Sequence, residues 1–528
     1  MLSMPTARLF YPILLIVFSC GCAFLQASDV PASPMPSVTP PPVTLVPTLE
    51  RQMQPIVTTT PPPTSTPDAV ACVPASEQPV ALHTVQADLD YINRTVMVRQ
   101  QIRFTNVTHR PLSQLVLYAK PAARPGVFEL NRVTLVPAER PLLYRLDSQR
   151  LVVDLPQPLL AGCELSLTLE FELIVPPIDI GGADALRGYL GYSPRQINLG
   201  QWLPVVAPFQ RGTWVIRDES RVGEQDVLDM ADWDVTLTSA NAPESLRAAA
   251  PGQIEENRPG RWRFVLRGGR DFSLSLSDQF ILSSQMASNG IKVELYSFED
   301  ARIKLTDGVI DSAAYALDVA TRSAALFAEL FGPYPYERLI VVQGDFPDGM
   351  EFSGLVFVGG EYFRGFSGPT SYLMMITAHE IAHQWWYAKV GNDAALTPWL
   401  DEALATYSEY AFIEAHYPAL RDWWWGFRVD SLSPQGFVDS TVYEFNSRRA
   451  YINAVYLRGV RMLQALREDL GTEAFYDWLR RYAEAGAGRI MSPADFWGLL
   501  SPEQLDATQA TRERYLRQPQ IVLITGSS

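Results

Sequence analysis

The chain has 528 residues, enough for more than one domain, and its 47% hydrophobic and 19% charged residues are ordinary for a packed protein. Its formal net charge at pH 7 is −15, and no run of Lys and Arg interrupts that acidity. Because nucleic-acid binding needs clustered cations against phosphates, the composition argues against such a partner. An acidic surface keeps a protein soluble and also attracts cationic ligands, and both interpretations stay open.

Residues 1–22 have the pattern of an export signal. Arg8 is the lone positive charge, and the apolar run from Leu9 to Phe18 is shorter than the roughly 20 residues that span a bilayer as a helix. The segment ends in Ser19-Cys20-Gly21-Cys22, which resembles the cleavage box of bacterial lipoproteins, with Cys20 or Cys22 as the lipidated residue. We therefore expect an extracytoplasmic protein, lipid-anchored to the membrane surface, with an uncleaved signal anchor and plain secretion as alternatives.

Residues 23–74 form the predicted linker. The stretch from Ser28 to Pro67 is dominated by Pro, Thr, Ser and Val, and proline lacks the amide donor that helices and sheets need. We expect an extended spacer between the anchor and the folded part. The two further cysteines are Cys72 and Cys163. A disulfide between them would persist outside the cytoplasm, and the alternative is two unpaired cysteines.

Residues 75–289 have the pattern of a β-rich domain. Apolar residues occupy every second position in several runs, most clearly from Leu165 to Leu173. Such alternation is typical of strands that bury one face. Strands at this density, without long helical stretches, favour a β-sandwich-like domain. The other alternating runs begin at Val85, Val96, Trp233, Trp262 and Phe272.

The periodicity changes in the second predicted domain, residues 290–507. Apolar residues recur at spacings of three and four from Ile310 to Phe327, which predicts an amphipathic helix that ends at Gly332-Pro333. The expected fold class is therefore multidomain α+β. The remaining predicted elements are strands at Lys292 to Phe298, Leu339 to Val342 and Leu355 to Val358, helices from Tyr372 to about Leu500, and a C-terminal tail at 508–528.

His379-Glu380-Ile381-Ala382-His383 is a His-Glu-x-x-His motif in a stretch without Gly or Pro. On a helix, positions i and i+4 share one face, so both imidazoles can bind one zinc ion with Glu380 beside them as a base. The chain contains 5 histidines. At that frequency, the probability of a chance match is on the order of 1%.

Glu402 follows His383 after 18 intervening residues and opens a second helical pattern. A turn at Gly391-Asn392-Asp393 would make the two helices antiparallel and bring Glu402 to the metal. Three protein ligands leave a fourth position for water, as a catalytic zinc requires, whereas structural sites usually have four ligands, often Cys. We predict one Zn2+ per chain, held by His379, His383 and Glu402.

The motif with Gln384-Trp385-Trp386, together with Trp399-Leu400-Asp401-Glu402, resembles the membrane-alanyl aminopeptidase family, gluzincins related to leukotriene hydrolase. The resemblance covers most of the chain from about Val80 to Leu500. It implies a thermolysin-like mixed sheet and helical zinc-peptidase domain after the β-sandwich-like domain. Many family members continue into a long helical domain over the active site. Here 72 residues follow Tyr456, so we expect a more open cleft that admits longer peptides.

The exopeptidase motif of that family, Gly-Ala-Met-Glu-Asn, has a counterpart in Asp348-Gly349-Met350-Glu351-Phe352. The resemblance implies that Glu351 binds the free α-amino group of the substrate and that Gly349 and Met350 belong to the substrate-binding strand. Gly349 stands in place of Ala, and Phe352 in place of Asn. These departures put the strictness of aminopeptidase action in question. The alternative role of Glu351 is a solvated carboxylate at a strand end.

Tyr456-Leu457-Arg458-Gly459-Val460 is similar to the family's Tyr-x-Lys-Gly-Ala segment. The resemblance implies that Tyr456 donates a hydrogen bond to the developing oxyanion. Tyr451 and Tyr443 are the alternatives for this role. A further alternative is that Tyr456 is simply a packed core residue.

The motif and the resemblance predict a zinc-dependent aminopeptidase that removes N-terminal residues by metal-activated water. Glu380 takes the proton of the water and passes it to the leaving amine, while Tyr456 stabilises the oxyanion. The expected partners are peptides with a free N-terminus. One alternative is a zinc endopeptidase of the same fold. Another is a non-catalytic lipoprotein that keeps the fold as a scaffold.

Overall fold

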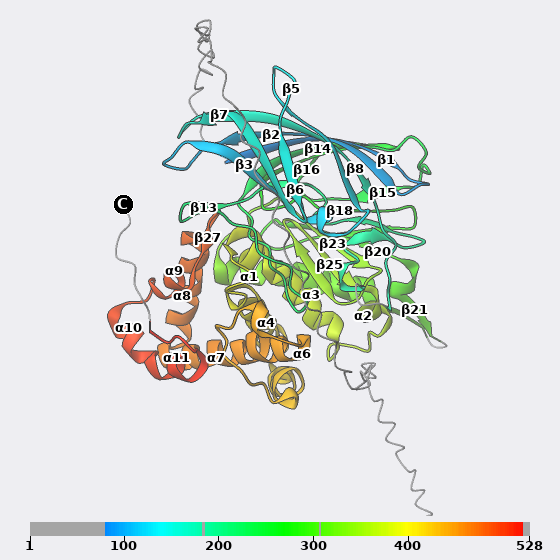
Figure 1. Ribbon diagram of the computed structural model, residues 1–528. Coiled ribbons are helices and arrows are strands. Elements are labelled where there is room, and N and C mark those ends of the chain that lie inside the picture. Colours follow the sequence, from blue (N-terminus) through cyan, green and yellow to red (C-terminus); the bar gives the residue numbers. More distant parts are fainter. Residues whose placement is uncertain (1–79, 182–184, 306–307, 521–528) are drawn as a thin grey trace, which may run out of the picture. The chain divides into compact units, whose positions relative to one another are not determined.

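The computed structural model describes residues 80–181, 185–305 and 308–520 (Figure 1). The predicted signal peptide and linker, with Cys20, Cys22 and Cys72, lie outside the described residues. Cys163 is disulfide-bonded, which contradicts the alternative that it is unpaired. Within the described ranges, none of the helices combines the length and the hydropathy needed to cross a membrane.

A large mixed sheet organises the first part of the chain, in the strand order β16-β17-β14-β1-β2-β8-β4-β5. The predicted alternation is confirmed, since Leu167, Leu169, Phe171 and Leu173 of β8 are fully buried. Strands β1 and β14 pair in parallel, whereas β1 and β2 are antiparallel. The strands span β1 (Ala81–Asp90), β2 (Thr95–Thr105), β4 (Phe128–Leu135), β5 (Arg140–Pro141), β8 (Glu164–Ile174), β14 (Ala231–Thr238), β16 (Gln253–Arg258) and β17 (Arg261–Gly269).

Two four-stranded sheets, β15-β18-β10-β9 and β11-β3-β7-β6, share one hydrophobic core with the large sheet. Trp202, Trp233 and Trp262 lie fully buried in that core. This arrangement confirms the β-sandwich-like domain. The strands span β3 (Leu112–Tyr118), β6 (Tyr144–Asp147), β7 (Arg150–Leu159), β9 (Leu190–Tyr192), β10 (Ile197–Leu199), β11 (Val205–Val206), β15 (Arg247–Ala249) and β18 (Leu274–Ser277), beside the two-stranded β12 (Phe209–Gln210) and β13 (Thr213–Trp214).

A second, five-stranded sheet has the order β19-β20-β23-β25-β24. Strands β20, β23 and β25 are parallel, and the edge strands β19 and β24 are antiparallel to their neighbours. The three predicted strands are confirmed. Residue 290 is the predicted start of the second domain. Strand β19 ends at Met286 and pairs with β20, so the second sheet begins before that residue. Its strands are β19 (Ile281–Met286), β20 (Lys292–Ser297), β23 (Arg338–Gly344), β24 (Gly349–Phe352) and β25 (Leu355–Gly359).

The predicted amphipathic helix is α1 (Ser312–Phe331). Asp311 caps its first turn by accepting a hydrogen bond from the amide of Ala314, and Gly332 ends it with a φ of 88° that disfavours side chains. Helix α1 contacts β19 and β20, while α3 (Tyr372–His383) contacts β24 and β25. The helix that carries the zinc motif therefore lies against the edge strand that carries the exopeptidase motif.

Further helices complete the second domain (Figure 1, yellow to red). In the described part of the predicted tail, Tyr515 and Leu516 are buried in the core beside α7. The elements are α2 (Gly360–Arg364), α4 (Trp399–His416), α5 (Arg421–Trp424), α6 (Arg448–Tyr451), α7 (Arg458–Leu470), α8 (Thr472–Ala485), α9 (Pro493–Trp497), α10 (Pro502–Ala507) and α11 (Gln509–Tyr515), with the π-helical turns η4 (Gln384–Lys389), η6 (Trp425–Val429) and η9 (Ile452–Leu457), and the short strands β21 (Arg302–Leu305), β22 (Gly308–Asp311), β26 (Gly391–Asn392) and β27 (Ile490–Met491).

Arg270 joins the first domain to the segment that follows the zinc helix. Its buried guanidinium donates hydrogen bonds to the carbonyl oxygens of Tyr387 (2.7 Å), Leu228 (2.7 Å) and Arg489 (2.9 Å). Next to it, Asp271 accepts a hydrogen bond of 2.6 Å from the Tyr387 hydroxyl. The C-terminal end of α3 and η4 is thereby fixed in place by the first domain.

Candidate metal centre

Helix α3 carries His379 and His383 one turn apart, and their ring centroids lie 4.7 Å from each other. Every residue of this helix after Tyr372 is buried, because the helix packs between the sheet, α1 and α4. Two imidazoles inside such a helix need polar partners, since an unpaired buried polar group is costly. The sequence-based expectation that both rings project from one face is met.

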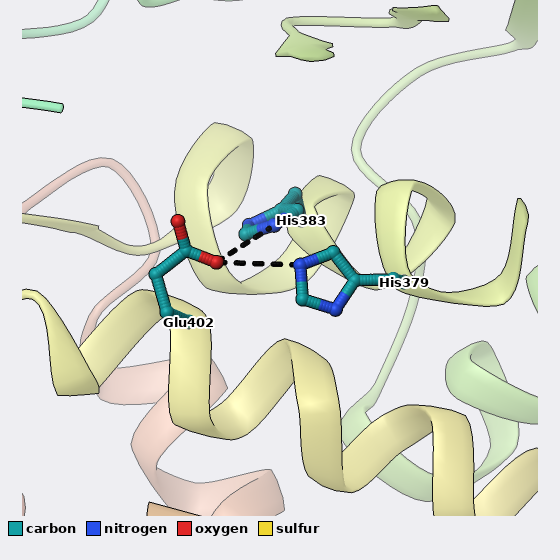
Figure 2. A group of neighbouring side chains, drawn as sticks. All are labelled: His379, His383 and Glu402. Carbon is teal, nitrogen blue, oxygen red and sulfur yellow. Dashed lines mark hydrogen bonds and ion pairs between the residues drawn. The ribbon is translucent and has the colours of Figure 1, made fainter. Parts of the chain in front are cut away.

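Glu402 reaches the same point from the first turn of α4 (Figure 2). Its Oε2 lies 3.3 Å from Nε2 of His379 and 3.6 Å from Nε2 of His383. Nitrogen and oxygen atoms that converge on one point in this way surround the position of a shared cation. The three residues expected to bind zinc are thus brought together, with their ligand atoms within 4.8 Å of one another.

A second layer of carboxylates orients the two imidazoles. Nδ1 of His379 lies 3.0 Å from Oε1 of Glu409, and Nδ1 of His383 lies 2.6 Å from Oδ1 of Asp401. An ionised carboxylate only accepts hydrogen bonds, so Nδ1 carries the proton in each ring and Nε2 keeps its lone pair for a metal. Arg428 donates to both oxygens of Glu409 and neutralises it.

No motif in the sequence marks these second-layer roles. Asp401 directly precedes Glu402 in the Trp399-Leu400-Asp401-Glu402 motif, which does not indicate that this carboxylate orients a histidine. Glu409 follows Glu402 by seven residues, a spacing that returns to the same helix face, so the helical period could have found it. Arg428 carries no such signal, because it lies on a different element and meets Glu409 only through the fold.

The residues present fit a zinc ion. Burial alone would lower the pKa of His379, but hydrogen bonds to Glu402 and Glu409 outweigh burial and raise it to about 10. In Glu402, burial is likewise outweighed by the His379 hydrogen bond, and its pKa lies below the ordinary value. The pocket thus favours positive charge at the shared point, which a divalent cation supplies in place of a proton. Two imidazoles and one carboxylate are the ligand set of a catalytic zinc.

Glu380 and Glu351 lie beside His383, and one ligand atom from each of these three residues lies within 4.8 Å of the others. Both residues are 5% exposed, and neither Oε2 of Glu380 nor Oε1 of Glu351 has a hydrogen-bond partner among the described residues. Oε1 of Glu351 lies 3.9 Å from Nδ1 of His383. Burial, together with neighbouring carboxylates, raises the pKa of each well above the ordinary value. Buried acceptors without partners are suited to receive groups of a bound ligand.

Strand β24, at the open edge of the five-stranded sheet, brings Glu351 into the site. A side chain at Gly349 would overlap the Glu380 carboxylate, which would then have to shift from its observed position. Asp348 adopts a φ of 70°, the left-handed region that favours the glycine found there in the exopeptidase motif. Met350 points the other way, into an apolar core cluster, so only its backbone is available to a ligand.

Gln384 ties β24 to the zinc helix. Its side-chain oxygen accepts a hydrogen bond from the amide of Gly354 (2.9 Å), and its side-chain nitrogen donates to the carbonyl of Phe352 (3.0 Å). The residue directly after the second zinc histidine therefore holds the far end of the edge strand. This pair of bonds fixes the distance between Glu351 and the histidines.

Two of the three candidate tyrosines, Tyr456 and Tyr451, lie near the residues expected to bind zinc. The ring of Tyr456 stacks on His379 at 5.9 Å and 7°, close enough to Glu402 for the carboxylate charge to act on its hydroxyl. Burial and the charge of Glu402 raise the pKa of Tyr456 well above the ordinary value, so the phenol keeps its proton. Tyr451 packs edge-on against Tyr456 at 5.5 Å. Tyr443 lies elsewhere, exposed, with its hydroxyl on the carbonyl of Asp218.

Glu224 approaches the site from the first domain. It belongs to the segment between β13 and β14, and the neighbouring Gly223 packs against the Tyr451 hydroxyl, 2.8 Å from where a Cβ would stand. Burial raises the pKa of Glu224 well above the ordinary value, and Asp226 and Glu402 raise it further. No motif marked Glu224 in the sequence, because its segment is irregular and its neighbours are distant in the chain.

Comparison with known proteins gives a consistent result for the second domain. Residues 315–513 match the model of the family described as Peptidase family M1 domain. Aminopeptidase M1-B of Oryza sativa subsp. japonica is 28% identical over 219 residues, 38% of this chain and 25% of that protein. Endoplasmic reticulum aminopeptidase 1 of Mus musculus is 27% identical over 230 residues, 40% of this chain and 24% of that protein. The chain thus spans about a quarter of the length of these relatives.

Solved structures cover more of the chain. The M1 zinc metallopeptidase from Deinococcus radiodurans has a TM-score of 0.59 at 19% identity, over 85% of this chain and 96% of that one. A mutant of that enzyme, described as bound to a Tyr-Ser-Ala substrate, has a TM-score of 0.56 at 19% identity, over 83% and 94% of the two chains. At this identity the likeness is one of fold, and it confirms the expected fold class.

Proposed function

Residues 315–513 are a peptidase family M1 domain, that of a zinc metallopeptidase, and on this premise we propose that the chain is an aminopeptidase acting on peptides with a free N-terminus. His379, His383 and Glu402 would hold one Zn2+ per chain. The observation that carries the proposal is the convergence of this ligand set with two buried carboxylates, Glu380 and Glu351, whose oxygens Oε2 and Oε1 have no hydrogen-bond partner in the described part of the chain.

Glu380 is the general base of the proposed reaction. When bound, zinc would supply two effects, a pKa of about 7 for the attacking water and polarisation of the scissile carbonyl. Glu380 then accepts the proton of the attacking water and delivers it to the leaving amine. The protonated Tyr456 hydroxyl, beside His379 and Glu402, donates a hydrogen bond to the oxyanion. Each of these groups is held by packing or hydrogen bonds, which the reaction requires.

Glu351 determines where the peptide is cut. The peptide adds as a strand to the free edge of β24, and its ammonium group pairs with the buried Glu351 carboxylate. Burial of an ammonium group is costly unless the group is paired with an opposite charge, which Glu351 provides. An N-acetylated peptide has no ammonium group and loses this interaction. In the endopeptidase alternative, Glu351 has no role in counting from the N-terminus.

The names of the relatives support the aminopeptidase proposal. Both curated relatives described above are called aminopeptidases, and the solved neighbour is described with a tripeptide substrate. The departures at Gly349 and Phe352 do not disturb the geometry that the proposal needs. Gly349 leaves room for the Glu380 carboxylate, and Phe352 is a core residue whose carbonyl anchors Gln384.

For location, we propose an extracytoplasmic protein lipid-anchored through Cys20 or Cys22, with residues 23–74 as the spacer. The support is the sequence pattern of residues 1–22. Growth with radiolabelled palmitate should label the wild-type chain and leave the Cys20→Ala/Cys22→Ala variant unlabelled. Equal labelling of both chains, or of neither, would contradict the anchor.

The decisive experiment measures hydrolysis of a panel of aminoacyl chromogenic substrates beside their N-acetylated versions, with and without a zinc chelator. Chelator-sensitive cleavage of the free-amine set alone supports the proposal and the role of Glu351. Cleavage of acetylated peptides would indicate an endopeptidase. No cleavage by the zinc-loaded protein would indicate the scaffold.

A further inference from the structure

A row of aromatic rings leads away from the substrate edge. Tyr362, in α2, donates a hydrogen bond of 3.1 Å to Asp348, the residue that precedes β24. Its ring centroid lies 6.1 Å from that of Tyr372, which lies 5.5 Å from that of Phe427. Phe427 in turn stacks on Trp423 at 5.3 Å and 11°. We call Tyr362, Tyr372, Phe427 and Trp423 the aromatic row.

The outer rings of the aromatic row face solvent. Tyr372 is 47% exposed and Phe427 is 41% exposed, while Tyr362 and Trp423 are half-buried. A single exposed ring needs no explanation, but rings in contact with one another form an apolar surface. Aromatic rings at a surface bind other large side chains through area and ring geometry. The row therefore has the properties of a recognition surface.

The position of the aromatic row relates it to the substrate residues that follow the cleaved bond. In the proposed reaction, the ammonium group of the peptide lies at Glu351 and its first carbonyl lies near Glu380. Because Glu380 packs against Gly349, the peptide runs from Glu351 towards Gly349, which is antiparallel to β24. The residues after the cleaved bond then pass Gly349 and Asp348 and arrive at Tyr362. Tyr372 supports this direction, because it opens α3 two turns before His379 on the same helix face.

The spacing of the rings suits an extended peptide. Neighbouring rings of the row lie 5.3 to 6.1 Å apart. In an extended chain, side chains on the same face are separated by about 6.6 Å, twice the rise per residue. Alternate side chains of a bound peptide can therefore each contact the row, whereas the intervening side chains point away.

We propose that the aromatic row binds the substrate residues C-terminal to the cleaved bond and selects peptides with aromatic or large apolar side chains at alternate downstream positions. This inference rests on the aminopeptidase function proposed above. The occupant is the peptide, because the row continues directly from Asp348 at the substrate edge. A second copy of this chain is the competing occupant.

The test compares two peptides with the same first residue, one with alanine throughout and one with phenylalanine at alternate downstream positions. The variant is Tyr372→Ala/Phe427→Ala, and the matched control is Phe437→Ala, which removes another exposed ring (43%) of the same domain. The double variant should lose about tenfold in kcat/KM for the phenylalanine peptide, mainly through KM, since two aromatic contacts are removed. Its activity on a short chromogenic substrate should stay within about twofold of wild type.

Three results would overturn the inference. The first is an equal loss for both peptides, which indicates a structural role. The second is a wild-type enzyme without preference between them. The third is concentration-dependent self-association that the double variant abolishes, which identifies a second copy as the occupant.

Failure of the aminopeptidase function itself is seen separately, as absent cleavage of the chromogenic substrate by wild type. In that case, binding of the phenylalanine peptide with a reduced first peptide bond, compared between wild type and the double variant, still decides whether the row binds peptides.

Discussion

The ligand side and the substrate side of the site are built in opposite ways. On the ligand side, Nδ1 of each imidazole is paired with a carboxylate, and Arg428 holds one of those carboxylates in turn. On the substrate side, Glu380 Oε2 and Glu351 Oε1 are buried acceptors without a partner among the described residues. The histidines therefore have their hydrogen bonds formed before a ligand arrives, whereas Glu380 and Glu351 keep unpaired oxygens to which a ligand can bind.

The largest expected effect concerns the substrate side. Glu380→Gln removes the proton acceptor but keeps the shape, so activity should fall by about 10^4-fold, the upper range for general acid–base catalysis. Zinc content, measured by atomic absorption, should stay equal to wild type because Glu380 is not a ligand. Retained activity in this variant would falsify the assignment of Glu380 as the base.

The next effect tests the binding of the ammonium group. Glu351→Gln should lower kcat/KM for free-amine substrates by about 100-fold, since a buried charge loses its partner. The residual activity should distinguish free-amine from acetylated peptides much less than wild type does. A variant that still rejects acetylated peptides as strongly as wild type would show that another group recognises the N-terminus.

On the ligand side, removal of one orienting carboxylate should have a smaller effect. Asp401→Asn and Glu409→Gln should each weaken zinc affinity by roughly tenfold to 100-fold, as is typical of groups that hold metal-binding histidines. Competition with a zinc-binding dye measures this directly. Full activity at saturating zinc would agree with an orienting role, whereas unchanged affinity would contradict it.

The last prediction concerns stability rather than activity or zinc affinity, and it lies at the domain junction, outside both sides of the site. Burial raises the pKa of Asp271 to about 6, although Tyr387 and Ser353 donate hydrogen bonds to it. The folded state therefore binds the proton more tightly than the unfolded state does. The unfolding free energy should fall by up to about 3 kcal/mol as pH rises from about 4 to about 6, and stay level above.

Urea unfolding of wild type and Asp271→Asn across this pH range checks the prediction. The variant should lose the dependence, because its side chain does not ionise. Asp234→Asn is the control, since hydrogen bonds from Arg263 keep the pKa of Asp234 below the ordinary value and its effect falls at lower pH. If Asp271→Asn keeps the wild-type slope, another group is responsible for it.

Local patterns predicted the elements that carry the chemistry. The spacing of His379 and His383 on one helix, and the apolar periodicity of α1, depend on residues within a few turns of each other. The predicted domain boundary at residue 289 and the predicted tail after residue 507 have no such local period behind them. Strand β19 joins the second sheet, and α11 packs on α7, through contacts with elements elsewhere in the chain.

The sequence by itself predicted the zinc ligands and Glu380 from residue types at characteristic spacings, and the role of Glu351 from the family resemblance. Only the tertiary structure decided that Glu224 and Arg428 belong to the site, that Tyr443 does not, and that the aromatic row continues from Asp348. The physical reason is distance along the chain. A helical period relates neighbours within a few turns, whereas packing brings together residues from separate elements, and no short pattern records that contact.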